Sequence, residues 1–455
     1  MGEHPVELRP TLGLFDATAI GLGAIIGGGI FVVKGIVAGL AGPALVISIV
    51  IAGVISLFTA LSFVELTAWL PKEGSIYEFA NRLISPFAGF LGGWMWIVSN
   101  TFAGAAVSMG FSYYLTALIP AIDPRWVPVA ICVAFTIINL VGVRQSALFN
   151  NALVTAKVLI LFVFIIVGTF RLSPANFTPL IPSGAGVLYG AYFIFFAFSG
   201  FGRIAVLSEE VKDAKRIVPR SILLALALSG VIYILVGTVA VGLIGADGLA
   251  SSNSPLVKAI QTVGNPFLVY LVSAGGMFAT ASVLLTSILG VSRMAFSMSR
   301  RGDLPQALNA LHHKFDTPYI SILIIGIITV LLAVFVDLTG IVGVSTFVSL
   351  FYYALANASA LRLNVANRVY PKFVPAVGLA TSIALGALVQ PSAFAMGAVC
   401  LAVGAIYYLS IHHRGHHGRS LSFRSHAKRF VMRRMGTVAT TTATTHSHVG
   451  TDGET

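Results

Sequence analysis

Twelve long apolar stretches follow one another along this chain, and they limit its possible folds more than any other feature of the sequence. Each is about as long as, or longer than, the helix of about 20 residues that crosses the hydrocarbon core of a bilayer. Only 10% of the residues are charged, against about 25% in soluble domains, so a water-soluble fold would lack the charge to cover its surface. We therefore expect an all-α membrane protein with twelve transmembrane helices. The expected spans are 14–36, 43–68, 87–118, 126–143, 151–170, 187–206, 219–243, 266–291, 319–336, 340–361, 373–390 and 392–411.

Lysine and arginine are divided unevenly between the two sides of these spans. If the N-terminus is cytoplasmic, the segments on the far side hold only Lys34, Arg125, Arg171 and Lys258 of the 28 basic residues. Cytoplasmic loops carry the excess of such residues, so we expect a multi-pass protein of the cell membrane with both termini in the cytoplasm. Attraction to anionic membrane lipids then accounts for the net charge of +12. No nucleic-acid partner is expected.

The residues within the spans do not favour an enzyme, a channel or a metal protein. A membrane-embedded enzyme would need paired ionisable residues in the spans, and the sequence has no such pair, no HExxH and no Gly-x-Ser-x-Gly. A channel would be expected to repeat a filter motif. The two cysteines, Cys132 and Cys400, lie in separate apolar runs, which argues against a disulfide framework and a metal cluster. The sequence predicts no cofactor and no metal site.

The first expected span contains an unusual run of glycines. The stretch 18–35 reads TAIGLGAIIGGGIFVVKG, and Gly27, Gly28 and Gly29 stand in a row near its middle. Glycine in a helix interior costs about 0.5–1 kcal/mol relative to alanine, so a simple membrane anchor would not contain this run. Close packing between helices through small residues is one explanation, and the spacing of Gly23 and Gly27 allows it.

The sixth span shows a matching interruption. Ser199, Gly200 and Gly202 break an aromatic run in the stretch YFIFFAFSGFGRIAV. Glycine-interrupted spans in corresponding positions of two halves point to a transporter site, where unwound backbone at mid-membrane binds the substrate. Backbone N–H groups freed there suit a carboxylate, and freed carbonyls suit an ammonium group. The companion break makes a binding site a better explanation than packing alone.

The stretch GLGAIIGGGIF (21–31) resembles the first-helix signature of the amino acid–polyamine–organocation (APC) superfamily of permeases. Four later stretches are similar to motifs of the same superfamily and occur in its order. These are FVELTAWLPKEGSIYEFA (63–80), FFAFSGFG (195–202), SEEVKDAKRIVPRSI (208–222) and SRMAFSMSRRGDLP (292–305). The resemblance covers about residues 10–410.

This resemblance implies a LeuT-like fold. Helices 1–5 and 6–10 would form a five-plus-five inverted repeat with helices 1 and 6 broken, and helices 11 and 12 would be additions. The implied segments are a cytoplasmic N-terminus 1–13, a first repeat 14–170, an extracellular loop 171–186, a second repeat 187–361, two added helices 362–411 and a basic, then low-complexity, cytoplasmic tail 412–455.

The resemblance also implies an L-amino acid substrate bound between the two breaks. The N–H groups of the glycine run would bind its α-carboxylate, carbonyls from both breaks would bind its α-ammonium group, and Phe198 or a neighbouring aromatic residue would close over it on the outer side. The substrate-binding residues implied in this way are Ile25, Gly27, Gly28, Gly29, Phe196, Ala197, Phe198, Ser199 and Gly200.

One lysine, Lys157, lies within the fifth span, about two turns from its cytoplasmic end. A lysine inside a span is costly and is a functional hypothesis by default. It would then be an amine that alternates between protonated and neutral forms as the site opens to each side. The alternative is a lysine that extends its head to the inner interface.

The resemblance favours the first interpretation of Lys157. Some members of the superfamily that couple uptake to protons have a lysine at this place, with its ammonium group where sodium-coupled relatives bind the ion. The implied partners here are Gly23 and Ile26 of helix one and Ser282 of helix eight. Thr280, Thr286 or Ser287 could take the place of Ser282.

Arg203 departs from the superfamily pattern. Many members have an acidic residue at the position of Gly202, and few have arginine next to it. Arg203 could line the inner exit path and disfavour cationic substrates, or reach the inner headgroups, or pair with an acidic residue, for which Asp16, Glu209 and Glu210 are the candidates. Glu65, at the inner end of helix two, is expected to act as a cytoplasmic gate or cap, with a local pair to Lys72 as the alternative.

Together these features predict a secondary active transporter and not an enzyme. We expect a proton-coupled symporter of amino acids that works by alternating access, with the proton and the membrane lipids as its other partners. The alternative is an exchanger of amino acids or polyamines that does not use a proton gradient.

Overall fold

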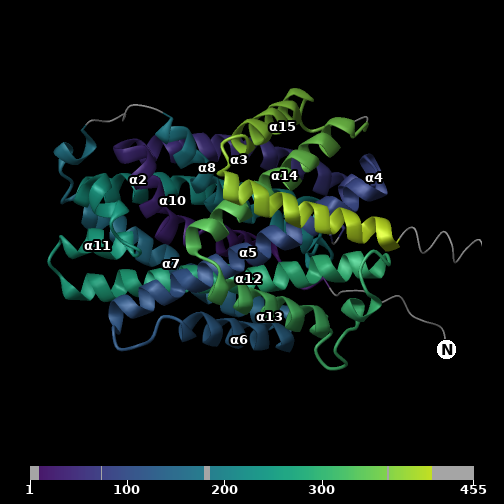
Figure 1. The fold of residues 1–455 in the computed structure, drawn as a ribbon, viewed down its shortest axis with the longest axis horizontal. Helices are drawn as coiled ribbons and strands as arrows, with labels where there is room; N and C mark the ends of the chain where they lie inside the picture. The colour runs from purple at the N-terminus through teal and green to yellow at the C-terminus, as the bar shows by residue number, and fades with distance from the viewer. Residues whose placement is uncertain (1–9, 73, 179–184, 366–367, 412–455) are drawn as a thin grey trace, which may run out of the picture. The chain divides into compact units, whose positions relative to one another are not determined.

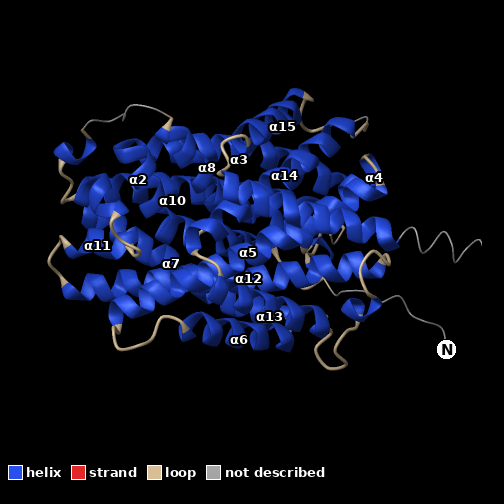
Figure 2. Cartoon of the chain, in the orientation of Figure 1, coloured by secondary structure: helices blue, strands red, loops and turns tan. Residues whose placement is uncertain are grey.

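The computed structural model describes residues 10–72, 74–178, 185–365 and 368–411, and within these ranges the chain is folded into helices joined by loops (Figures 1 and 2). Among the residues described, the one isolated pairing of extended backbone is a parallel bridge between Leu12 and Val211. The expected tail 412–455 lies outside the described residues. The chain divides into two compact units, Met1–Ala402 and Val403–Thr455.

Each expected apolar stretch falls mostly on helical residues. Eight helical segments within the described ranges are long and apolar enough to cross a membrane, and three shorter apolar helices accompany them. The expectation of an all-α, multi-pass membrane protein is therefore confirmed. The helices are α1 (Leu14–Ile25), α2 (Lys34–Ala41), α3 (Leu45–Trp69), α4 (Ile76–Leu83), α5 (Pro86–Leu118), α6 (Trp126–Val141), α7 (Val143–Thr169), α8 (Gly186–Phe198), α9 (Gly202–Val206), α10 (Ala214–Ala250), α11 (Pro255–Gln261), α12 (Pro266–Arg300), α13 (Tyr319–Phe335), α14 (Leu338–Arg362), α15 (Phe373–Gly386) and a last helix, Pro391–Ile411.

Local capping signals fix where several of these helices begin. The Ser85 side chain accepts a hydrogen bond at the start of α5, directly before Pro86. The Asp337 carboxylate accepts one from the Gly340 N–H at 2.8 Å at the start of α14. Asn265 does the same for α12. Such side chains accept hydrogen bonds from N–H groups that have no partner within the helix. Proline fits the first helical position because it has no N–H group that would need a partner there.

The first membrane segment is broken in its middle. The helix α1 ends at Ile25, and Ile26 is extended, with φ −76° and ψ 94°. A π-helical turn, η1 (Gly29–Val33), follows and leads into α2. The break coincides with the glycine run. In the same way, α8 ends at Phe198 and continues through a 3-10 turn, η4 (Ser199–Phe201), into α9.

Within the first unit the helices pack in two groups. One group brings α1, α2 and α8 together with α3 and α10. In the other, α12 packs along α5 and α7, while α14 packs on α5 and α6 packs on α13 (Figure 1). The broken segment α1 also contacts α7 and α12. The two breaks therefore lie where the two groups meet.

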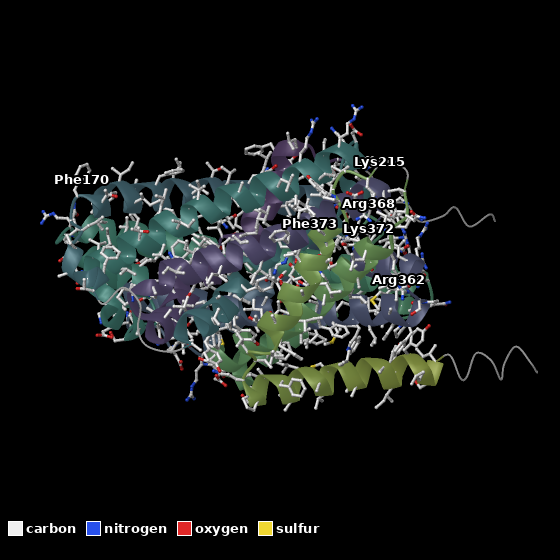
Figure 3. All side chains as sticks on the ribbon, turned by 90° about the horizontal axis from the view of Figure 1, so that it is seen from above. Phe170, Lys215, Arg362, Arg368, Lys372 and Phe373 are labelled. Carbon is white, nitrogen blue, oxygen red and sulfur yellow. The ribbon has the colours of Figure 1, made fainter. Side chains whose placement is uncertain are left out.

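Several basic residues gather at one end of this unit. Lys215, Arg362, Arg368 and Lys372 all lie at one end, and Phe170 lies at the opposite end (Figure 3). One basic residue departs from expectation. Lys34, which we expected in an outer segment, begins α2 and is completely buried, because the first helical segment continues to Ala41.

Candidate functional site

A single tyrosine connects the two breaks. The hydroxyl of Tyr233, on α10, lies 2.5 Å from the Ile25 carbonyl oxygen and 3.2 Å from that of Ala197. Ile25 is the last residue of α1, and Ala197 lies one residue before the end of α8. Both carbonyls belong to the set that the resemblance assigns to the substrate's ammonium group. The structure thus brings these two expected residues to one point, and it adds a hydrogen-bond donor that we did not identify from the sequence.

The glycines at the breaks permit very close packing. A Cβ atom on Gly27 would lie 2.1 Å from the Val283 side chain, and one on Gly29 would lie 2.1 Å from the Ala197 Cβ. A Cβ on Gly200 would lie 2.4 Å from backbone atoms of α1. The packing explanation for these glycines therefore holds alongside the break in the helix, because the residues serve both.

The aromatic residues of the second break face different ways. A Cβ on Gly28 would meet Val107 at 2.9 Å and the Phe196 ring at 3.9 Å, so Phe196 lies beside the glycine run. Phe198 is instead buried against the Tyr233 ring, with the ring centroids 5.0 Å apart. Ser199 donates a hydrogen bond to the Phe196 carbonyl at 2.8 Å.

The Lys157 side chain points to the break in helix one. It is completely buried, and its Nζ atom lies 2.5 Å from the Ile26 carbonyl oxygen and 2.6 Å from the Ser282 hydroxyl. The carbonyl oxygens of Leu22 and Gly23 lie 3.3 and 3.4 Å away. An ammonium group has three donors and no acceptor, so a set of oxygen atoms is its proper surrounding. In this structure the side chain does not extend to an interface.

Of the four α12 hydroxyls considered as partners of Lys157, the structure places one beside it. Ser282 contacts Lys157, whereas Thr280 and Thr286 donate to carbonyls of their own helix, and Ser287 donates to the Asn100 carbonyl of α5. Gly23, Ile26 and Ser282 are therefore gathered around Lys157.

Two asparagines on α7 hold that helix on α1, and we did not identify them from the sequence. The Asn150 amide donates to the Ala19 carbonyl at 3.1 Å, and the Asn151 amide donates to the Asp16 carboxylate at 2.8 Å. They lie about two turns before Lys157 on α7. The signal available was the pair of amides at the start of an apolar span, where buried polar groups need partners.

Arg203 has no acidic partner among the residues that the structure describes. Its side chain is 3% exposed, and its Nε donates to the Asn100 side-chain oxygen at 2.8 Å. The acidic candidates bond elsewhere: Glu210 to Arg293, Glu209 to Arg300 and Asp16 to Asn151. The interpretation of Arg203 as a member of an ion pair with one of these three is therefore wrong.

Glu65 is a cap rather than a partner of Lys72. Its carboxylate accepts hydrogen bonds from the backbone N–H groups of Val369 and Tyr370, at 2.9 to 3.1 Å. It thereby ties the end of α3 to the segment between α14 and α15.

In the described part of the chain, no group of three His, Cys, Asp or Glu side chains is placed to hold a metal ion.

Comparison with known proteins shows the family to which the chain belongs. The family model described as amino acid permease matches residues 12–412. The chain belongs to the amino acid permease family. An uncharacterized transporter of Mycobacterium tuberculosis is 36% identical over 407 residues, which cover 89% of this chain and 92% of that protein. A branched-chain amino acid permease of Bacillus subtilis is 33% identical over 73% of this chain and 76% of its own length.

More distant relatives extend to animals. The cationic amino acid transporter 4 of Mus musculus is 29% identical over 382 residues, 78% of this chain and 60% of the mouse protein. As a member of the amino acid permease family, the chain is a transmembrane transporter of the APC superfamily and not an enzyme. The family implies the LeuT-like fold, to which the two broken segments correspond. The expectations of a transporter and of APC membership are confirmed.

Proposed function

We propose that this permease is a proton-coupled amino acid symporter of the cell membrane that works by alternating access. The observation that carries the proposal is the position of the Lys157 ammonium group among the oxygen atoms of the helix-one break and Ser282. Carbonyl and hydroxyl oxygens form the kind of site that suits a cation. A lysine that provides the charge itself makes a metal ion unnecessary, and its proton becomes the coupled ion.

Loss of that proton changes what holds α1 in place. Protonated Lys157 offers three donors and a full charge to the carbonyls around it. The neutral amine offers fewer and weaker donors, so the contact between α7 and the end of α1 weakens. Because α1 also carries the substrate groups, protonation of Lys157 and the position of the binding site would be linked in one element.

The substrate would bind where the two breaks meet. Its α-carboxylate would contact the N–H groups of Gly27 to Gly29, and its ammonium group would contact the carbonyls of Ile25 and Ala197, with Phe196 and the segment 198–200 around it. The Tyr233 hydroxyl, with its single proton, lies within hydrogen-bond distance of both carbonyls. Each carbonyl oxygen has two lone pairs, so the hydroxyl and the ammonium group would share them.

The alternating movement would use the two helix groups. We propose twelve crossings, with the repeats 14–170 and 187–361 related by inversion and the segments 171–186 and 362–411 as the loop and the added helices. The group containing α1, α3, α8 and α10 would rock against the one containing α5 and α12. The end that carries Lys215, Arg362, Arg368 and Lys372 would face the cytoplasm (Figure 3), because cytoplasmic loops are rich in basic residues. Both termini, 1–13 and 412–455, would lie on that side.

Uptake into proteoliposomes tests the proposal. Labelled amino acids would be supplied with and without an inward proton gradient, beginning with the branched-chain set that the Bacillus relative's name suggests. Accumulation driven by the gradient, and its loss in Lys157→Ala with exchange retained, is the expected result. If labelled substrate moves only against unlabelled substrate inside, and the gradient has no effect, the protein is an exchanger and Lys157 is a structural cation.

A further inference from the structure

The Arg203 guanidinium group is a buried positive charge whose hydrogen-bond partners, among the residues that the structure describes, are all neutral. Besides the Asn100 oxygen, its Nη1 atom lies 3.1 Å from the Thr286 hydroxyl, and its Nη2 atom lies 3.4 Å from the Ser287 hydroxyl. The Val283 carbonyl lies 3.4 Å from Nη1. No carboxylate in the described ranges forms an ion pair with it.

Such a charge is costly unless it is compensated. A buried ion without a counter-charge is strongly unfavourable, and neutral hydrogen bonds replace only part of the lost hydration. Two of the hydrogen bonds here are 3.4 Å long, which is at the weak end of the range. A second buried cation, Lys157, increases the cost of this charge because like charges repel. Lys157 lies close by: Thr286 donates a hydrogen bond to the Ser282 carbonyl, and the Ser282 hydroxyl contacts the Lys157 ammonium group. The surroundings therefore favour an anion.

The guanidinium group lies next to the proposed substrate site. Arg203 is the second residue of α9, directly after the break that contains Ser199 and Gly200. Its neighbour Val283 packs its side chain over Gly27. One residue of α12 thus separates Arg203 from the glycine run, so a bound molecule that extends inward from the break would approach this charge.

We propose that Arg203 is the cation of an anion-binding subsite beneath the break between α8 and α9, and that the anion is the side-chain carboxylate of an acidic amino acid substrate. A free inorganic anion such as chloride is the second source of the same chemistry. The position of the subsite rests on the proposed substrate site. The structure thus points to a preference for acidic over cationic amino acids.

The chain offers a way to place an internal anion beside the subsite. A Cβ atom on Gly202 would meet nothing closer than the Trp96 Nε1 and the Tyr353 hydroxyl, both at 3.7 Å, so a side chain has room to start there. In Gly202→Asp a carboxylate next to Arg203 would compensate its charge. Gly202→Asn has nearly the same shape without the charge and is the matched control.

The experiment compares L-glutamate with L-glutamine, which have the same shape and differ in charge. Uptake into proteoliposomes and thermal stabilisation of the purified full chain would be measured for the wild type, Arg203→Gln, Arg203→Lys and the two Gly202 variants. We expect the wild type to prefer glutamate over glutamine and over arginine by tenfold or more. Arg203→Gln and Gly202→Asp should remove that preference, whereas Arg203→Lys and Gly202→Asn should keep a measurable part of it.

The outcomes separate this subsite from the proposed function. Chloride would also be replaced by gluconate. If this replacement lowers glutamine uptake in the wild type but not in Arg203→Gln, the subsite binds a free anion. Proton-driven uptake of neutral amino acids with neither a glutamate preference nor chloride dependence overturns the subsite and leaves the proposed function standing. Stabilisation by glutamate that requires Arg203, without proton-driven uptake of any amino acid, overturns the proposed function and keeps the subsite. Size-exclusion profiles identify variants that fail to fold. If Arg203→Gln is one of them, the glutamate preference of Arg203→Lys, which keeps the charge, tests the subsite instead.

Discussion

The Lys157 ammonium group and the Ser282 hydroxyl lie 2.6 Å apart, although 125 residues separate them in the sequence. This contact joins α7 to α12, and the Ser282 hydroxyl also lies 3.2 Å from the Gly23 carbonyl of α1. Three helices therefore meet at one buried charge. The protonation state of Lys157 therefore depends on the positions of α1, α7 and α12 together, and not on α7 alone.

Removal of the Ser282 hydroxyl should weaken coupling specifically. A hydrogen bond to a charged group contributes about 1.5–3 kcal/mol, so we expect Ser282→Ala to lower proton-driven uptake about tenfold or more in proteoliposomes. Thr280→Ala is the control, since the Thr280 hydroxyl is buried but donates to the carbonyls of Gly276 and Met277 in its own helix. Equal losses in the two variants would show that the effect comes from packing of α12 and not from the contact with Lys157.

The glycine run should not tolerate even a methyl group at its end. In Gly29→Ala the new Cβ would lie 2.1 Å from the Ala197 Cβ and 2.4 Å from its Cα. Overpacking of this kind costs about 1–3 kcal/mol, and we expect lower thermal stability in detergent and strongly reduced uptake. The double variant with Ala197→Gly should recover part of both, because it removes the nearest atom.

Gly386→Ala is the control for this series. Nothing lies within 4 Å of a Cβ at Gly386, in the last turn of α15. We expect its melting temperature to be unchanged or slightly raised, because alanine lowers the entropy of the unfolded chain. A loss at Gly386 as large as the loss at Gly29 would mean that glycine matters here for reasons other than close packing.

The Tyr233 hydroxyl should be necessary to hold the two breaks together. Tyr233→Phe keeps the ring that packs on Phe198 and removes the donor to the Ile25 and Ala197 carbonyls. Buried acceptors that lose their donor cost about 1–3 kcal/mol, so we expect reduced thermal stability and uptake reduced about tenfold. Tyr189→Phe is the control, because that ring is 41% exposed on α8. Wild-type uptake by Tyr233→Phe would show that the hydroxyl only fills space.

The breaks in the helices could be predicted because a glycine run or an interrupted aromatic run indicates, within a single segment, where the backbone can leave the helical conformation. The Lys157 partners came from a known pattern of the superfamily rather than from the spacing of residues. The choice of Ser282 over Thr280, Thr286 and Ser287 required the structure. It depends on how α12 is rotated about its axis, and apolar residues that face lipid do not differ in hydropathy from those that face the core.

The residues that we missed share one property. Tyr233 and Asn150 make contacts with residues more than 100 positions away, and each is a polar group in or beside an apolar span. The sequence shows that such a group needs a partner but not which one. Lys34 illustrates a different failure: it stands near the end of the expected span 14–36 and was counted with the outer segment, whereas the helical segment continues to Ala41 and buries the lysine.

The packing of α12 against the segment before α1 should depend on a buried ion pair. Arg293 Nε donates to the Glu210 carboxylate at 2.6 Å, and both side chains are almost completely buried. The Glu210 carbonyl also accepts hydrogen bonds from the N–H groups of Thr11 and Leu12, each at 2.9 Å. The same residue thus connects α12 and the segment that precedes α1. Loss of one partner of a buried pair costs about 3–5 kcal/mol, because the other charge is left uncompensated.

We therefore expect Glu210→Gln to lower the melting temperature strongly and to reduce uptake of every substrate alike. The neighbouring pair of Glu209 with Arg300 is partly exposed, at 21% and 30%, and surface pairs contribute about 0–1 kcal/mol. Glu209→Gln should accordingly change the melting temperature little. If the two variants unfold at the same temperature, burial does not distinguish the pairs. The charge at Glu210 would then contribute no more to stability than a surface charge does.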